Sequence, residues 1–320
     1  MDPFVAKHLQ GVSRTYAILV PMLPNSLADA VGVAYLLMRI IDTLEDDSRL
    51  ATEQRLKHFD TVEMALEGEI EAGSALREVI GDTAAERELM VDAPEVFARV
   101  RALEPEYREA VCQCARKMSG GVRHLIARSD ERDAPYPAIR DAAELREYCY
   151  YVAGVVGEML CAMMAHFLRL PTLARLHEVA VELGIGLQLV NILKDAMKDS
   201  KQGRRYLPVA DGGNVSHAEI YKAVLQEARQ SLRRGTEFVL ALPAGARELR
   251  SFCGLPIAWG AMTLARAERD PGGAKIGRGA IHSSMEMFAR IAGDDRSLRR
   301  WLSSILKSSN AEGAGAAGMA

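Results

Sequence analysis

Two long apolar segments, each carrying a single polar stripe, constrain this 320-residue chain more than any other feature. Almost every residue of segment 31–47 before Asp42 is apolar, so a helix here should be buried nearly all round. At about 100° per residue, however, four polar side chains share an arc of about 60°: Tyr35, Arg39, Asp42 and Asp46. Because an unpaired buried carboxylate is very costly, the stripe predicts a water-filled or ion-filled cavity beside the helix.

The second apolar segment, residues 179–199, repeats the pattern much further along the chain. Its polar residues fall within an arc of about 80°: Gln188, Asn191, Asp195 and Asp199. If the two helices face each other, their carboxylates line opposite walls of one chamber. Carboxylates one turn apart suit hard cations, and Mg²⁺ shares its coordination with substrate phosphates. A solvated acidic face is the alternative for either stripe alone, but two such helices together favour a metal site.

Helical periodicity also dominates the rest of the chain, and no convincing alternating strand is present. Aromatic residues make up only 6% of the chain while Ala, Leu and Met are plentiful, which favours helices over sheets. No linker or internal repeat divides the sequence. We therefore predict one all-α domain over residues 1–307, a helical bundle, and a disordered tail at 308–320. The expected helices span residues 3–20, 26–48, 50–72, 84–90, 92–101, 104–128, 142–169, 172–201, 216–241, 244–269 and 279–307.

Charge and cysteine content exclude several classes of protein. Lys and Arg number 40 against 43 Asp and Glu, which leaves no electrostatic footprint for nucleic acid. The five cysteines form no C-x-x-C pair and favour reduced thiols in a cytoplasmic protein. The seven histidines lack the spacing of a zinc site, and no signal peptide is evident. The apolar stretch 151–170 contains Glu158, His166 and Arg169, so we expect a buried core helix there and not a membrane span.

Four sequence blocks, in order, resemble the signature motifs of the squalene/phytoene synthase family. They read YLLMRIIDTLEDD at 35–47, YCYYVAGVVG at 148–157, QLVNILKDAMKD at 188–199 and QGRRYLP at 202–208. The first two are closest to the blocks of the family's squalene synthases, and the likeness extends over residues 8–285. The resemblance implies the family's fold, an all-α bundle of the isoprenoid synthase type around a central cavity.

The resemblance also implies a reaction, in which two farnesyl diphosphates condense head to head through presqualene diphosphate and NADPH reduces the product to squalene. In the family two aspartate-rich motifs bind Mg²⁺, which neutralises the diphosphate leaving group. The matching residues here are Asp42, Glu45 and Asp46 in the first motif and Asn191, Asp195 and Asp199 in the second. The four aspartates among them are expected to be catalytic, together with Tyr148.

Further residues are assigned by their places in the matching blocks. Tyr148 matches a tyrosine implicated in cyclopropane formation; because a phenol is a weak base, the diphosphate is the alternative base, with Tyr148 as a relay. Lys275 and Arg278 match a stretch that contacts phosphates of NADPH or presqualene diphosphate. The loop 128–138 lies where the family has a mobile flap. The residues expected to bind substrate are Ser13, Arg14, Thr15, Tyr35, Arg39, Val152, Ala153, Gly154, Gln188, Asn191 and Arg204.

Other functions stay open at this point. Non-reductive relatives make dehydrosqualene, hydroxysqualene or phytoene, and the cavity depth that sets chain length is not visible in a sequence. A non-catalytic assembly factor on the same fold is disfavoured, because such proteins tend to lose the acidic motifs. We expect two farnesyl diphosphate molecules as the ligands, no nucleic acid partner and a cytoplasmic protein. The sequence leaves the oligomeric state open and is compatible with a monomer. Peripheral contact with a membrane is compatible with lipid substrates, whereas Trp301–Leu306 is too short to span one.

Overall fold

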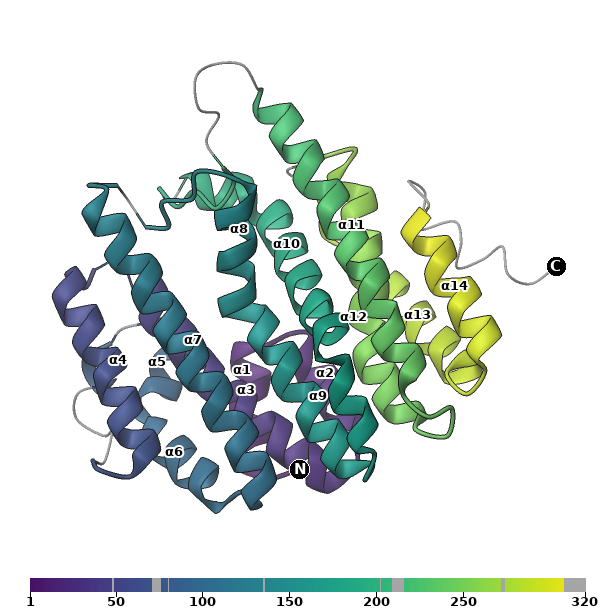
Figure 1. Ribbon diagram of the computed structural model, residues 1–320, viewed down its shortest axis with the longest axis horizontal. Coiled ribbons are helices and arrows are strands. Elements are labelled where there is room, and N and C mark those ends of the chain that lie inside the picture. The colour runs from purple at the N-terminus through teal and green to yellow at the C-terminus, as the bar shows by residue number, and fades with distance from the viewer. Residues whose placement is uncertain are drawn as a thin grey trace.

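The computed structural model describes residues 1–47, 49–70, 76–79, 81–134, 136–201, 203–208, 216–271 and 274–307, without the side chain of Arg77. These residues form helices and contain no strand, so the predicted all-α fold is confirmed (Figure 1). The tail predicted at 308–320 lies outside the described residues.

The bundle is built around four helices, α7, α9, α10 and α11, that lie side by side (Figure 1). Helix α3 packs behind α7 and α9, and α4, α5 and α6 pack against α3 at one side. At the other side α13 and α14 cover α12. The helices are α1 (Pro3–Val12), α2 (Tyr16–Leu19), η1 (Val20–Met22), α3 (Asn25–Asp46), α4 (Thr52–Glu67), η2 (Leu76–Glu78), α5 (Ala84–Val91), α6 (Ala93–Ala102), α7 (Pro105–Glu131), α8 (Ala142–Cys149), η3 (Tyr150–Gly154), α9 (Val155–Phe167), η4 (Pro171–Leu176), α10 (His177–Lys201), α11 (His217–Ala241), α12 (Arg247–Ala267), α13 (Arg278–Ile291) and α14 (Asp295–Lys307).

Two of the predicted helices are interrupted by local hydrogen bonds of capping side chains. The helix expected at 3–20 stops at Ser13, whose Oγ accepts a hydrogen bond from the Tyr16 backbone nitrogen at 2.9 Å. The helix expected at 279–307 breaks before α14, where an Asp294 carboxylate oxygen accepts from the Ser297 backbone nitrogen at 2.7 Å. Such side chains accept hydrogen bonds from backbone N–H groups that have no partner at the start of a helix, and here they begin new helices inside the predicted ones.

Helices α9 and α10 approach so closely that glycines are needed between them. A Cβ added to Gly157 would lie 2.1 Å from the Ala180 carbonyl oxygen, and one added to Gly184 would lie 2.2 Å from that of Ala153. Ala153 belongs to η3, a π-helical turn joining α8 to α9. Gly157 and Gly184 also line the central cavity, so they serve both the close helix contact and the cavity wall.

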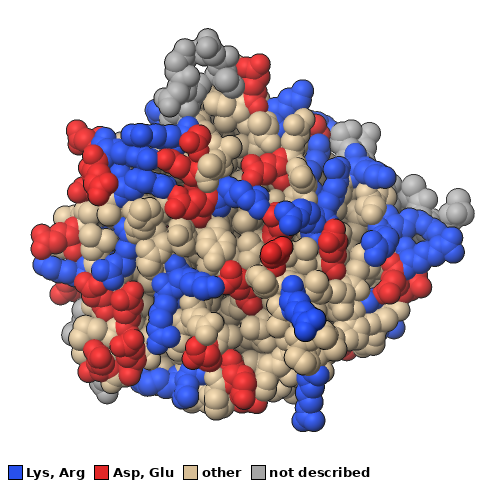
Figure 2. Space-filling view, viewed as in Figure 1, with Lys and Arg blue, Asp and Glu red and all other residues tan. Residues whose placement is uncertain are grey.

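Two apolar stretches, Ala142–Phe167 and Pro171–Lys201, are long and apolar enough to cross a membrane by length and composition alone. About half of the most apolar window of each, 56% and 50%, is buried inside the bundle. Both stretches pack against each other and against neighbouring helices, as core helices of a bundle do. On the face seen in Figure 2, Lys and Arg side chains are interspersed with Asp and Glu.

Candidate active site

A largely apolar cavity of about 220 Å³ lies between α3, the η3–α9 segment, α10 and α12. Polar side chains enter it from two sides. Tyr35, Arg39 and Asp42 come from α3, and Gln188 and Asn191 come from α10. The structure thus brings members of both polar stripes to one cavity, and Val152 and Ala153 contribute to its apolar wall.

The acidic ends of the two stripes converge beside this cavity. Arg204 links them: its Nη1 lies 3.1 Å from Asp46 Oδ1, and its backbone nitrogen donates to the Asp199 carbonyl oxygen at 2.9 Å. Burial raises the pKa of the Asp199 carboxyl, and the nearby charges of Asp195 and Asp46 raise it further. Asp46 and Asp199 lie in the last turns of α3 and α10, where the helix dipole favours cations over carboxylates.

The carboxylates of the first stripe favour binding of an added cation, because the neighbouring arginines do not fully offset the cost of their burial. Burial raises the pKa of both Asp42 and Asp46, although Arg39 opposes the shift in both. Their side chains remain 36% and 45% exposed, so water screens part of this effect and its direction is what matters. Oxygen donors at two converging helix ends suit Mg²⁺. The donor set of Asp42, Asp46, Asn191, Asp195 and Asp199 therefore fits the metal that the family resemblance implies.

Glu45 has surroundings different from those of the other acidic residues. It is only 3% exposed and is not among the residues that line the cavity. Its Oε1 accepts a hydrogen bond from the Tyr136 hydroxyl at 2.7 Å. Burial raises the pKa of Glu45 to about 8, and the charges of Asp46 and Asp42 add to the rise, while hydrogen bonds with Tyr136 and Tyr148 oppose it.

Tyr148 lies in α8, is 4% exposed, and reaches the acidic end of α3 through other aromatic residues. Its ring centroid is 5.2 Å from that of Tyr206, whose hydroxyl donates to Asp46 Oδ1 at 3.4 Å. Burial raises the pKa of Tyr148 well above its usual value. The sequence reasoning missed Tyr206 and Tyr136 as site residues. Tyr206 lies inside the block QGRRYLP, so the family resemblance could have identified it as a site residue. Tyr136 lies in the loop that was expected to be a flap.

Arg39 is the cation best placed for an anionic ligand in the cavity. Its Nη2 donates weakly to the Tyr35 hydroxyl at 3.3 Å and to the Val12 carbonyl at 3.4 Å. Its Nη1 lies 3.9 Å from Asp42 Oδ2, and its buried Nε has no hydrogen-bond partner. A guanidinium group with an unsatisfied N–H is suited to phosphate oxygens.

The remaining predicted residues do not line the cavity. Ser13, Arg14 and Thr15 form the turn after Val12, with Arg14 and Thr15 exposed. Gly154 packs against Val181 of α10, whose Cγ1 would lie 3.2 Å from an added Cβ. Lys275 and Arg278 are exposed near the start of α13 and do not line the cavity.

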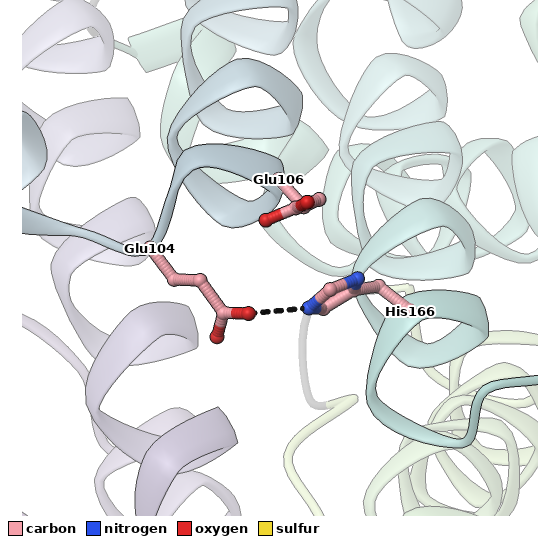
Figure 3. A group of neighbouring side chains, drawn as sticks. All are labelled: Glu104, Glu106 and His166. Atoms are coloured by element: carbon pink, nitrogen blue, oxygen red, sulfur yellow. Dashed lines mark hydrogen bonds and ion pairs between the residues drawn. The ribbon is translucent and has the colours of Figure 1, made fainter.

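A second group of potential metal ligands lies where α7 begins and α9 ends (Figure 3). Ligand atoms of Glu104, Glu106 and His166 all lie within 4.8 Å of one another. Glu104 Oε1 and His166 Nε2 are 2.8 Å apart, and both glutamates are exposed. The sequence showed no such spacing, because the group is assembled across the fold. Its geometry is that of an ion pair linking the two helices.

The all-α bundle with two acidic helix ends beside an apolar cavity has the fold of the isoprenoid synthases. A family model described as squalene/phytoene synthase matches residues 9–281. The chain therefore belongs to the squalene/phytoene synthase family.

Curated relatives and solved structures agree with this placement. The squalene synthase of Schizosaccharomyces pombe is 26% identical over 276 residues, covering 82% of this chain and 59% of the relative. The squalene synthase of Bos taurus is 28% identical over 203 residues, covering 63% of this chain and 45% of the relative. The chain spans about half the length of the curated relatives it matches. The complex of TcSQS with the ligand BPH1237 shares the fold, with a TM-score of 0.79 at 20% identity over 97% of this chain and 94% of that one. The complex of a dehydrosqualene synthase with a ligand also shares the fold, with a TM-score of 0.60 at 19% identity. The match covers 89% of this chain and 94% of that one.

Proposed function

We propose that this protein is a prenyltransferase that condenses two farnesyl diphosphates head to head through presqualene diphosphate. The observation that carries the proposal is that polar residues of both stripes line one apolar cavity, with Asp42 on one wall and Asn191 on another, and that Arg204 links Asp46 to Asp199 beside it. A diphosphate needs cations and polar groups, whereas a farnesyl chain needs an apolar wall. The cavity offers both within one enclosure.

Different residues of this chain would contribute to the ionisation of an allylic diphosphate. The two acidic stripes would hold Mg²⁺, which supplies charge neutralisation at the leaving diphosphate when it is bound. Arg39 lies 3.9 Å from Asp42 and Arg204 lies 3.1 Å from Asp46, and both add guanidinium donors for phosphate oxygens. The apolar wall formed by Val152, Ala153 and their neighbours excludes water from the reacting carbon atoms.

The second part of the proposal is reduction by NADPH to squalene. Its support is the family resemblance of Lys275 and Arg278, together with the similarity to curated squalene synthases. Both residues are exposed and do not line the cavity, so we derive no step through the nucleotide. The non-reductive alternative makes dehydrosqualene, hydroxysqualene or phytoene. We place the protein in the cytoplasm, in peripheral contact with a membrane that supplies its lipid substrate.

Product analysis tests the proposal. The purified protein is incubated with farnesyl diphosphate and Mg²⁺, with and without NADPH, and the products are identified by mass spectrometry. We expect presqualene diphosphate without NADPH and squalene with it. Geranylgeranyl diphosphate, supplied in a parallel reaction, should be a poorer substrate.

Three other outcomes separate the alternatives. Dehydrosqualene or hydroxysqualene that forms regardless of NADPH would assign the protein to the non-reductive branch. Phytoene from geranylgeranyl diphosphate at a higher rate would change the substrate. No product from either diphosphate at saturating Mg²⁺ would refute the proposal and favour a non-catalytic member of the family.

A further inference from the structure

A buried hydrogen-bonded network at the end of α3 centres on Glu45. The carboxylate accepts from the Tyr136 hydroxyl at 2.7 Å, and the buried Tyr148 side chain is close enough to interact electrostatically with the same carboxylate. The Arg55 guanidinium carbon lies 5.8 Å from the Tyr136 ring centroid, and Arg55 Nη1 donates to the Glu45 carbonyl oxygen at 3.4 Å. Glu45 thus connects α3 with α4 through its backbone and with Tyr136, in the segment after α7, through its side chain.

The same contacts make Glu45 a poor metal ligand. Metal coordination needs carboxylate oxygens that an ion can reach, and Glu45 neither lines the cavity nor is exposed beside it as Asp46 is. Its Oε1 is already bound by a phenol donor, and Glu45 as a whole is only 3% exposed. Asp42 and Asp46, three residues before and one residue after, are on the partly exposed stripe.

We propose that Glu45 is a positioning residue, which orients the Tyr148 hydroxyl and ties Tyr136, in the segment after α7, to α3, and that it does not ligate metal. When the Tyr148 O–H donates to Glu45, the lone pairs of the phenol oxygen remain free for a developing cation or its proton. The hydrogen bond from the Tyr136 hydroxyl to Glu45 Oε1 fixes the direction of the carboxylate. This inference rests on the proposed function, in which Tyr148 serves the cyclopropane-forming step.

The first test measures metal binding without catalysis. Mn²⁺ affinity is determined by electron paramagnetic resonance in the presence of inorganic pyrophosphate. Loss of a ligand or its support costs about 10–100-fold in metal affinity, so Asp46→Asn should weaken binding to that extent. Glu45→Gln should bind Mn²⁺ as the unmodified protein does. Equal weakening in both variants would make Glu45 a ligand and overturn the inference.

The second test is a double-mutant cycle on the single-turnover rate of presqualene diphosphate formation. A small misplacement of a reacting group costs about 100-fold, which is the loss expected for Glu45→Leu. Glu45→Gln keeps one acceptor oxygen and should recover part of the rate. The double variant Glu45→Leu/Tyr148→Phe should be no slower than Tyr148→Phe alone, because residues that act through one another are not additive.

A matched control and an independent fold check complete the design. Glu158→Gln removes the carboxylate that accepts from the Tyr150 hydroxyl at 3.0 Å, a Tyr–Glu pair that does not line the cavity, and should leave the rate unchanged. If Glu45→Leu does not fold, Tyr136→Phe replaces it in the cycle. If the rate loss of the double variant equalled the product of the losses of Glu45→Leu and Tyr148→Phe, the positioning role would be overturned. Absence of presqualene diphosphate in the unmodified protein would instead refute the proposed function and leave the Mn²⁺ result standing.

Discussion

At the scale of single residues, neighbouring carboxylates of α3 have different environments. Asp42 and Asp46 are four residues apart and lie on one partly exposed stripe, while Glu45 turns into a buried network. At about 100° per residue a helix presents positions i and i+4 on one face and moves i+3 towards its edge. Residues inside one acidic motif can therefore have separate chemical roles.

Loss of either acidic stripe should abolish turnover. Asp46→Asn and Asp195→Asn each remove a charge from the group that fits Mg²⁺, and we expect a fall in kcat of about 1,000-fold for each. Circular dichroism should show that both variants stay folded, because both side chains are partly exposed. Activity equal to that of the unmodified protein at saturating Mg²⁺ in both variants would contradict the metal assignment.

Glu45 should make the metal-free protein lose stability as the pH rises. Burial raises its pKa from 4.5 to about 8 in the folded state. A carboxyl group of this kind contributes stability that is fully present below pH 4.5 and is lost as the pH rises through about 8. Thermal melts in EDTA should show that the stability difference between Glu45→Gln and the unmodified protein shifts in favour of Glu45→Gln between pH 5 and pH 8. A difference independent of pH would contradict the raised pKa.

The sequence carries the polar stripes but not the tyrosine network. Periodicity alone placed Tyr35, Arg39 and Asp42 on one face of a buried helix, because helical geometry is local. Tyr136 is 91 residues from Glu45, and only the tertiary fold brings its hydroxyl to the carboxylate. No local rule predicts such a contact, whereas the family resemblance groups Glu45 with Asp42 and Asp46 as metal ligands.

At the scale of helices, the contact between α9 and α10 determines the shape of one cavity wall. Gly157 and Gly184 allow the two backbones to approach within contact distance, and the π-helical turn η3 precedes this contact. The sequence placed these helices correctly but not their ends. Ser13 and Asp294 interrupt predicted helices because a capping side chain competes with a continuing helix, and periodicity does not detect that competition.

A methyl group at Gly184 should destabilise the protein. Its Cβ would lie 2.2 Å from the Ala153 carbonyl oxygen, so Gly184→Ala should cost about 1–3 kcal/mol through overpacking. Gly120→Ala on α7 is the matched control, because nothing lies within 4 Å of its added Cβ. Gly120→Ala should stabilise the protein by about 0.5–1 kcal/mol, because alanine loses less backbone entropy than glycine when the helix folds. Urea denaturation measures both, and equal effects would show that the close approach is not needed.

At the scale of the whole molecule, the cavity draws its walls from helices far apart in the sequence. Helix α3 brings the first polar stripe, α10 the second, and α12 part of the apolar wall. The α12 contribution includes Pro256 in the helix interior, and no sequence pattern indicated that this helix would reach the cavity. Sequence reasoning therefore predicted the two polar walls and the all-α fold but not the complete enclosure.

The loop before α13 should affect only the reductive step. Lys275→Ala with Arg278→Ala removes two exposed cations that do not line the cavity, so the first condensation should keep most of its rate. The ratio of squalene to presqualene diphosphate should fall, and more NADPH should be needed to restore it. Measuring that ratio against NADPH concentration checks the role of the loop; an unchanged ratio would leave these residues as solvated surface charges.

The central claim is that both acidic stripes serve one diphosphate–metal site. A crystal structure with Mn²⁺ and farnesyl thiodiphosphate tests it directly, because the anomalous signal of Mn²⁺ locates each ion. We predict Mn²⁺ between Asp42 or Asp46 and the Asn191–Asp195–Asp199 side of the cavity, with the diphosphate bridging them and the farnesyl chain in the apolar cavity. Mn²⁺ bound to one stripe only, or at Glu104, Glu106 and His166 with the cavity free of metal, would contradict the account.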